Sequence, residues 1–290
     1  MLHESGFEIN DLDLSRVYTS GFSWLSSQFS RADTFSAKEL SSLILLYLET
    51  EETEGIKETE KIEETEKIEE TEKMKNAESL LARFLSLQNS DGSLGDIRDT
   101  ARFTSALFVI MSKKQKFLPP SFRLENDSPL IEAAKAAANK SLSYIMSQKE
   151  RWADNVYDLV YILSALADAG IFEPEFCLNL CEQDIPDWQH PGTTALIITA
   201  LQKQKNLSLF QDSETFISEF IEKKIDWLVS VRENGCWKYP ATSNLVLHAL
   251  ILCGPKRKAL ASLSWLVQSQ EKNGSWENDI NTTALSLLSL

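Results

Sequence analysis

The sequence predicts an all-α protein built as one α6/α6 barrel, a toroid of six helical hairpins. Apolar runs of helical length recur along the 290 residues, mostly after short loops that contain Gly or Trp. The loop from Gln88 to Ala101 also recurs in two parts near the C-terminus, as Gln270 to Trp276 and Asp279 to Ala284. Helical pairs repeated in this way bury their apolar faces by stacking on their neighbours, which favours a closed helical array.

The composition indicates a globular, cytoplasmic protein. Hydrophobic residues make up 43% of the chain and charged residues 25%, enough for a sizeable core. The formal charge of −14 and the absence of a basic stripe argue against a nucleic acid partner, because phosphate binding needs clustered Lys and Arg. No apolar run reaches the ~20 residues of a membrane span, and the N-terminus lacks the features of a signal peptide. Free thiols are expected at Cys177, Cys181, Cys236 and Cys253.

Residues 1–48 are expected to form the first helical hairpin of the toroid. Val17 to Phe29 form its first helix, and Ser36 to Leu48 carry apolar residues at helical spacing for the second. A Glu- and Lys-rich insertion follows at residues 49–75, with twelve Glu and five Lys, so it supplies −7 of the net charge. Its six-residue repeat advances about 240° per step on a helix and gives no apolar stripe, which predicts a solvated helix or disorder.

Residues 76–290 are expected to hold the remaining five hairpins. Each second helix is aligned on Thr194, whose equivalents are Ser36, Thr100, Leu159, Ser243 and Thr283. The preceding helices carry an aromatic residue in every unit but the degenerate one around Cys177 to Gln183: Trp24, Phe84, Tyr144, Trp227 and Trp265. A glutamine follows four of these aromatic residues, at Gln28, Gln88, Gln148 and Gln270, whereas Arg232 follows Trp227.

The two kinds of helix differ in polarity. The second helices are nearly all apolar, as in Leu196 to Leu201, and helices that are apolar on every side belong inside a protein. The first helices are amphipathic, with charged residues such as Glu222, Lys223 and Lys224 expected to face outwards. This predicts six inner and six outer helices.

The segment Trp265 to Trp276 resembles the Gln and Trp repeat of squalene-hopene cyclases and related terpenoid cyclases. Their barrels share the α/α toroid with the β subunits of protein prenyltransferases, and the similarity extends over nearly the whole chain. The resemblance implies structural roles for Gln270 and Trp276, which in that family link successive repeats. An indole packed on a helix end, with a Gln side chain bonded to backbone groups there, is a plausible physical form of this link.

The resemblance also implies an acid site. The family motif DxDD, followed by Thr and Ala, matches Asp96, Asp99, Thr100 and Ala101, but Arg98 stands where the family has its proton donor. Arginine gives up no proton, and its charge stabilises neighbouring carboxylates in their ionised form. Asp96 and Asp99 are therefore candidate catalytic residues and equally candidate helix caps, because a similar frame begins at Asp279.

A substrate site is predicted around this motif. Arg98 could bind a diphosphate or carboxylate in a bidentate way, or form an ion pair with Asp96 or Asp99. Aromatic residues before the second helices could line an isoprenoid cavity and stabilise carbocations through their π faces. They are Trp152, Tyr157, Trp188, Trp237, Tyr239 and Trp276. The candidates for substrate binding are Trp188, Tyr157 and Tyr239, and the other rings are more often structural. No resident cofactor is expected, and Mg²⁺ would enter only with a diphosphate substrate.

A zinc site of the prenyltransferase kind is not expected. That family uses Asp and Cys two residues apart with a later His, whereas here Asn234 replaces the Asp of Asn234-Gly235-Cys236 and no His follows His248.

Two functions from different classes therefore stay open. The first is a terpene cyclase-like protein, an isomerase or lyase if active, that binds a linear isoprenoid such as a prenyl diphosphate or squalene in the central cavity. The second is a non-catalytic toroid that binds a lipid or protein partner. A second toroid domain, a homo-oligomer and peripheral membrane contact are further expectations about partners.

Overall fold

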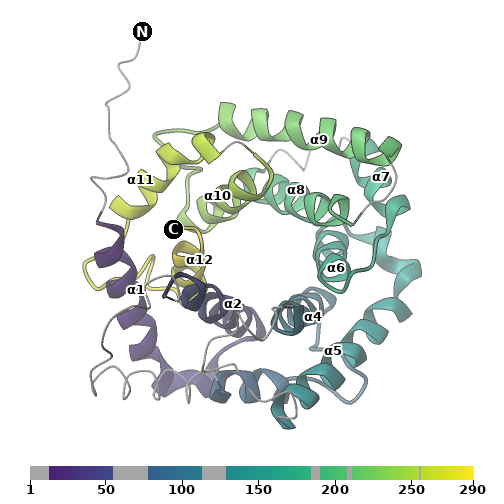
Figure 1. The fold of residues 1–290 in the computed structure, drawn as a ribbon, viewed down its shortest axis with the longest axis horizontal. Helices are drawn as coiled ribbons and strands as arrows, with labels where there is room; N and C mark the ends of the chain where they lie inside the picture. The colour runs from purple at the N-terminus through teal and green to yellow at the C-terminus, as the bar shows by residue number, and fades with distance from the viewer. Residues whose placement is uncertain (1–12, 55–77, 113–128, 184–189, 208–210, 255) are drawn as a thin grey trace. The chain divides into compact units, whose positions relative to one another are not determined.

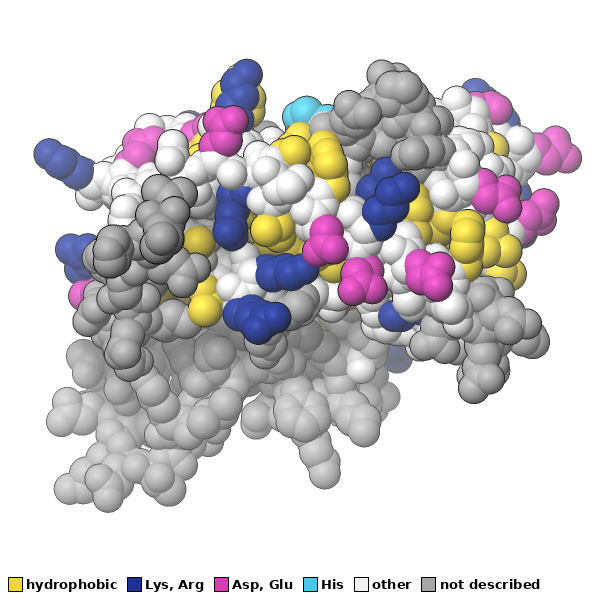
Figure 2. Space-filling model, turned by 90° about the horizontal axis from the view of Figure 1, so that it is seen from above, with side chains coloured by type: hydrophobic (Ala, Val, Ile, Leu, Met, Phe, Trp, Pro, Cys, Tyr) yellow, Lys and Arg dark blue, Asp and Glu magenta, His cyan; other side chains and the backbone are white. Residues whose placement is uncertain are grey.

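The computed structural model describes residues 13–54, 78–112, 129–183, 190–207, 211–254 and 256–290. Every regular element among these residues is a helix, and two isolated β-bridges occur in loops, so the all-α prediction is confirmed (Figure 1). The described helices include none with the length and hydropathy required to cross a bilayer. On the face shown in Figure 2, acidic and basic side chains are interspersed with hydrophobic ones.

The helices alternate as first and second members of hairpins. The first helices are residues 78–86 and α1 (Leu14–Gln28), α5 (Pro129–Ser147), α7 (Pro174–Glu182), α9 (Gln211–Ser230) and α11 (Leu260–Gln268). The second helices are α2 (Ala37–Glu54), α4 (Ile97–Ser112), α6 (Val156–Asp168), α8 (Pro191–Lys205), α10 (Pro240–Cys253) and α12 (Ile280–Leu288). Short 3-10 helices lie at η2 (Phe29–Thr34), η3 (Lys149–Asp154) and η5 (Lys256–Lys258). Helix α2 continues to Glu54, into the predicted insertion, and the rest of that insertion lies outside the described residues.

The chain divides into two compact units. The terminal unit comprises Met1–Gln28, Ile185–Thr199 and Glu219–Leu290, and the middle unit comprises Phe29–Asp184 and Ala200–Ser218. In the middle unit, α4 packs against α2, α5 and α6 (Figure 1), and the rings of Phe84 and Phe103 lie 4.6 Å apart in its core. In the terminal unit, α10 packs against α11 and α12, and α12 packs against α1. The first helix of the chain therefore contacts the last.

A common helix start confirms most of the predicted register. The backbone N–H of the aligned residue donates to the carbonyl four residues earlier at 2.9 to 3.1 Å, in the pairs Thr100–Asp96, Leu159–Asn155, Thr194–His190, Ser243–Tyr239 and Thr283–Asp279. The prediction is wrong by one turn at Ser36, because Leu40 donates to the Ser36 carbonyl at 3.0 Å. Ser36 and Glu39 instead form a reciprocal capping box, with Ser36 N donating to Glu39 Oε2 at 2.7 Å and Glu39 N to Ser36 Oγ at 3.3 Å.

In two of the loops, a glutamine side chain bonds the loop to the first helix of another hairpin. Gln88 Nε2 donates to the carbonyls of Gly92 at 3.3 Å and Ala137 of α5 at 2.8 Å. Gln270 Nε2 makes the same pair of bonds, to Gly274 at 2.9 Å and Val17 of α1 at 2.8 Å. Arg232, which replaces the glutamine after Trp227, donates from Nη1 to the Lys258 carbonyl at 2.9 Å. Arginine thus supplies the same kind of link as glutamine.

Each of these three loops contains a glycine that lies against the first helix of another hairpin. That helix is α5 or α11 for the first two loops and α1 for the last loop. Gly92, Gly235 and Gly274 have φ values of 98°, 85° and 94°. A Cβ atom on them would lie 2.5 Å from Lys140 O, 2.9 Å from Ala261 O and 2.2 Å from Ser20 O, respectively. Both the left-handed backbone and the close approach therefore require glycine.

Three buried tryptophans close the loops onto the helix that precedes them. Their Nε1–H groups donate to carbonyls near the helix end: Trp152 to Ile145 at 3.1 Å, Trp237 to Leu228 at 2.7 Å and Trp276 to Leu266 at 2.9 Å. Each indole thus adds a hydrogen bond to a carbonyl near the helix end, and the carbonyls of Ile145 and Leu266 also accept from Gln148 N at 3.0 Å and Ser269 N at 3.2 Å. Gln270 and Trp276 both bond backbone groups, which agrees with the structural roles expected of them.

In the degenerate unit around Cys177 to Gln183, the side chain that holds the loop comes from α8. Helix α7 is short, and the loop before it is held by the fully buried Gln204. Gln204 Nε2 donates to the carbonyls of Leu163 at 2.8 Å and Ile171 at 3.1 Å, and its Oε1 accepts from Glu173 N at 2.9 Å. A glutamine still holds the loop, but a different helix supplies it.

The four cysteines are free thiols, as predicted. Burial raises the pKa of the Cys177 and Cys181 thiols to about 12, so both stay protonated at pH values where an exposed thiol ionises. We expect iodoacetamide at a pH of about 8.5 to label Cys236 and Cys253 in the native protein, with Cys177 and Cys181 reacting only after unfolding. Mass spectrometry of labelled peptides measures this, and equal native labelling of all four would contradict it.

Candidate functional site

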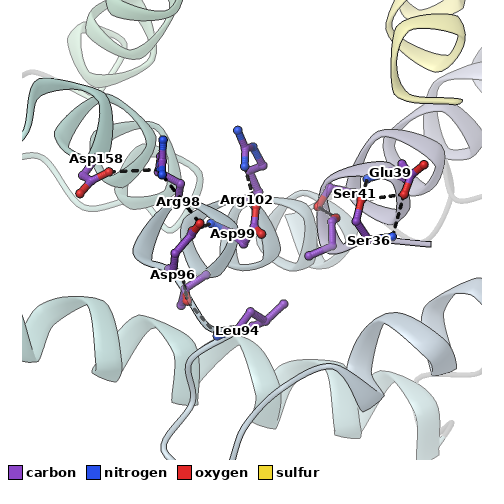
Figure 3. Close-up of polar contacts among 11 residues, drawn as sticks. Ser36, Glu39, Ser41, Leu94, Asp96, Arg98, Asp99, Arg102 and Asp158 are labelled. Carbon is purple, nitrogen blue, oxygen red and sulfur yellow. Dashed lines mark hydrogen bonds and ion pairs between the residues drawn. The ribbon is translucent and has the colours of Figure 1, made fainter. Parts of the chain in front are cut away.

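Asp96 is the N-terminal cap of α4. Its Oδ1 accepts from Asp99 N at 2.7 Å, and its carbonyl accepts from Thr100 Oγ1 at 2.7 Å (Figure 3). Thr100 Oγ1 in turn accepts from Leu94 N at 2.9 Å. These bonds fix the loop and satisfy N–H groups that the helix start leaves without intrahelical partners.

The start of α12 has the same construction. Asp279 Oδ1 accepts from Thr282 N at 2.7 Å, and Thr283 Oγ1 accepts from Trp276 N at 3.0 Å. Both loops therefore use an aspartate as a helix cap. This capping role accounts for an aspartate at position 96 without any catalytic role. What distinguishes α4 is the set of charged side chains that follows its cap.

Arg98 pairs with a carboxylate on the neighbouring helix. Its Nε lies 3.4 Å from Oδ1 of Asp158, which belongs to the first turn of α6, and its Nη2 lies 3.9 Å from Oδ2 of Asp96 (Figure 3). The Arg98 side chain remains 46% exposed. Asp158 was not predicted as a site residue, although it occupies the same place in α6, three residues after the cap, as Asp99 does in α4. The matching positions of Asp99 and Asp158 in their helices are the sequence feature that could have identified Asp158.

Asp99 pairs with Arg102 rather than with Arg98. Asp99 Oδ1 accepts from Arg102 Nη1 at 2.6 Å, and the Arg102 guanidinium lies 4.2 Å from the ring centroid of Tyr161 on α6. Arg98 and Arg102 are one turn apart on the same face of α4 and reach two positions one turn apart on α6. We call Arg98, Asp99, Arg102, Asp158 and Tyr161 the charged seam.

Polar contacts between α4 and α6 continue beyond the charged seam. Ser105 Oγ donates to Asp168 Oδ2, and Lys203 Nζ donates to both oxygens of Asp168 at 2.8 and 3.0 Å. The partly exposed face of α4 therefore carries Arg98, Arg102 and Ser105. The prediction that the second helices are nearly all apolar is wrong for this face, since a row of paired polar side chains runs along it.

The second helices of the terminal unit differ. The partly or fully exposed side chains of α10 are apolar apart from His248 and Cys253, and those of α12 are Leu285 and Leu288. On α10, Ala241, Leu245 and Leu252 follow helical spacing and share one face with His248. The second helices α10 and α12 of the terminal unit thus carry an apolar stripe, whereas α4 and α6 of the middle unit carry the charged seam.

The predicted aromatic site residues fall in different places. Tyr157 is exposed in the first turn of α6, next to Asp158 and the charged seam. Tyr239 is exposed at the start of α10 in the terminal unit, with Lys238 Nζ 4.9 Å from its ring centroid. Trp188 lies outside the described residues. Within the middle unit, Asp96, Arg98 and Asp99 lie at the start of α4, and Tyr157 precedes Asp158, the partner of Arg98, in the first turn of α6.

The described residues do not form a resident metal centre. No three of their His, Cys, Asp and Glu side chains are grouped so as to hold a metal ion. The carboxylates of Asp96, Asp99 and Asp158 each have an arginine nearby, which competes with a cation. The site instead contains the guanidinium groups of Arg98 and Arg102, each with five N–H donors. Three carboxylates lie beside them.

No protein-family model, curated protein or solved structure matches this chain. The resemblance to terpenoid cyclases therefore rests on the repeated Gln and Trp loops and on the Asp96 to Ala101 motif.

Proposed function

We propose that the helical hairpins close into a single α6/α6 toroid of the terpenoid cyclase kind. Support comes from the repeated loop construction, in which a Gln or Arg side chain and a glycine join one hairpin to the next. Further support comes from α1 and α12, because the last loop is bonded to the first helix through Gln270 and Val17. A solenoid whose last repeat joins its first has no exposed ends.

We further propose that the protein binds a linear isoprenoid with an anionic head, such as a prenyl diphosphate. The observation that carries this proposal is Arg98, a partly exposed cation in the first turn of α4. A cation there opposes the helix macrodipole, at a cost of about 0.3–1 kcal/mol, so structural stability alone does not favour it. Its ion-pair separations of 3.4 and 3.9 Å exceed those of strong hydrogen bonds, which leaves its N–H donors available to an anion.

The charged seam supports an anionic head group on the ligand. A phosphorylated head suits the two arginines of the charged seam, because guanidinium groups bind phosphate oxygens in a bidentate way. In a toroid, the second helices would line the central cavity. Tyr157, next to Asp158, would contact the ligand near its head.

Proton-initiated cyclisation is not part of this proposal. Asp96 Oδ1 accepts the Asp99 N–H in the helix cap and Asp99 Oδ1 accepts from Arg102 Nη1, so both carboxyl groups already have structural partners. Asp96 and Asp99 would instead position Arg98 and Arg102. The second candidate, a non-catalytic toroid with a protein partner, is favoured by the ion pairing of every charged side chain from Asp96 to Asp99.

Titration calorimetry with prenyl diphosphates tests the proposal. We expect binding of farnesyl or geranylgeranyl diphosphate, weaker binding of the free prenols and of inorganic diphosphate, and a loss of about tenfold or more in Arg98→Ala. Arg151→Ala is the matched control, because Arg151 is an exposed arginine that pairs with Asp154 at 3.9 Å outside the charged seam. If the wild-type protein binds no prenyl compound, or if Arg98→Ala binds as well as Arg151→Ala, the proposal fails.

A further inference from the structure

We infer that Asn234 is a site of spontaneous deamidation, and that its conversion to isoaspartate weakens the loop between α9 and α10. Asn234 is exposed, and it is followed by Gly235, which has no side chain to hinder attack by its own backbone nitrogen. The same pair of residues occurs once more, as Asn273-Gly274 in the loop between α11 and α12. The two loops therefore hold the same reactive pair in two different settings.

Asn234 and Gly235 form the tip of a tight turn. Glu233 and Cys236 exchange both of their backbone hydrogen bonds at 3.0 Å, and the φ values of 49° and 85° at the two central residues are typical of a type I′ turn. Among the described residues, neither the Asn234 side chain nor the Gly235 N–H has a hydrogen-bond partner. Local opening of the turn is therefore enough to bring the Gly235 nitrogen to the side-chain amide of Asn234.

The reaction needs only water. The Gly235 nitrogen loses its proton to solvent and attacks Cγ of Asn234, so that a C–N bond forms and the side-chain amide leaves as ammonia. Water then opens the resulting succinimide at one of its two carbonyl groups. One opening gives aspartate, and the other gives isoaspartate, in which the backbone runs through Cγ. One water is consumed and one ammonia is released, with no oxidation or reduction.

The bonds of Asn273 show how the fold blocks this reaction at the other pair. Asn273 Oδ1 accepts from Ser275 N at 3.0 Å and from Ser275 Oγ at 2.7 Å, and its Nδ2 donates to Asn278 Oδ1 at 2.7 Å. The Gly274 N–H donates to the Glu271 carbonyl at 2.9 Å. Attack requires these bonds to break, so deamidation there should be about 100-fold slower than in the loop between α9 and α10.

Isoaspartate at position 234 should weaken the contact between this loop and α11. It adds one methylene to the backbone of a turn that packs closely, since a Cβ atom on Gly235 would lie 2.9 Å from Ala261 O and 3.1 Å from Trp265 Cβ. The longer backbone no longer matches the short connection between Glu233 and Cys236. The loop and α11 both belong to the terminal unit, so that unit should lose stability.

Incubation of the full chain in mildly alkaline buffer, followed by peptide mass spectrometry, tests the inference. We expect the peptide that contains Asn234 to gain the mass that accompanies exchange of NH2 for OH and to separate into aspartate and isoaspartate forms. A protein isoaspartyl methyltransferase should methylate the second form. The peptide that contains Asn273 should stay unmodified over the same period, and the two peptides should react at similar rates in urea.

Two variants separate the contributions. Asn234→Gln should abolish the reaction at this position, because a glutamine side chain must close a larger and slower-forming ring. Incubated wild-type protein should therefore unfold at lower urea concentrations than fresh protein, whereas incubated Asn234→Gln should not. Asn278→Gly removes the acceptor of Asn273 Nδ2, suits the φ of 51° at position 278, and should speed deamidation of Asn273 about fivefold.

Circular dichroism should show that both variants are folded. Native protein in which Asn234 stays intact while the urea-denatured chain reacts would overturn the inference, and so would equal rates at Asn234 and Asn273 in the native protein. Equal loss of stability in incubated wild-type protein and incubated Asn234→Gln would overturn the effect on the loop. None of these measurements involves a prenyl compound, so they are independent of the proposed function.

Discussion

Replacing Gly274 by alanine is expected to lower the free energy of unfolding by about 3 kcal/mol. The backbone of Gly274 has φ at 94°, and a Cβ atom there would lie 2.2 Å from the Ser20 carbonyl oxygen of α1. The substitution therefore adds left-handed strain and forces the last loop away from the first helix, which weakens the bond from Gln270 to Val17. Urea unfolding followed by circular dichroism measures the change.

Gly95→Ala separates these two contributions. Gly95 has nearly the same φ, 91°, but a Cβ atom there would meet nothing within 4 Å. Gly95→Ala should lower the free energy of unfolding by only about 1 kcal/mol, because it adds backbone strain alone. Equal destabilisation by Gly95→Ala and Gly274→Ala would mean that the contact between the last loop and α1 contributes nothing to stability.

Arg98→Asp is expected to reduce prenyl diphosphate binding by more than about 100-fold while changing the free energy of unfolding by less than about 1 kcal/mol. The substitution removes the cation that approaches Asp158 and Asp96 and adds a carboxylate beside them. An acid in the first turn interacts favourably with the helix macrodipole, which offsets part of the new repulsion. Calorimetry gives the affinity, and urea unfolding gives the stability.

The same variant restores the DxDD pattern of the cyclases. Two nearby carboxylates should raise the pKa of the third, which is the condition for protonating an alkene. We therefore expect cyclised product from squalene with Arg98→Asp and none with the wild-type protein, measured by extraction and mass spectrometry. Undiminished diphosphate binding by Arg98→Asp would show that Arg98 does not bind the head group. Asp96 to Thr100 would then be a helix cap only.

The loop construction could be predicted from the sequence because its signals are local. Gln88, Gly92, Gln270 and Gly274 recur at the same spacing, and each makes the same bonds as its counterpart. The register failed at Ser36 because a capping serine and a serine one turn inside a helix look alike in sequence. Only the bonds of Glu39 and Leu40 distinguish the two positions.

The charged seam could be predicted only in part, because its pairs join different helices. Asp96, Arg98 and Asp99 stood out as a motif, whereas Asp158 and Tyr161 belong to the next hairpin and carry no motif of their own. The pairing of Asp99 with Arg102 also depends on which face of α4 meets α6. Hydrophobic periodicity identifies a buried face, but it does not show which partner an exposed charge meets.

The most direct test of the central claim, that the charged seam binds the head of an isoprenoid, is a crystal structure of the protein with geranylgeranyl diphosphate. We predict phosphate oxygens within hydrogen-bonding distance of the guanidinium groups of Arg98 and Arg102, with Asp158 displaced from Arg98 or sharing it. A diphosphate bound away from α4, with the contacts of Arg98 to Asp158 and Asp96 unchanged, would contradict the claim.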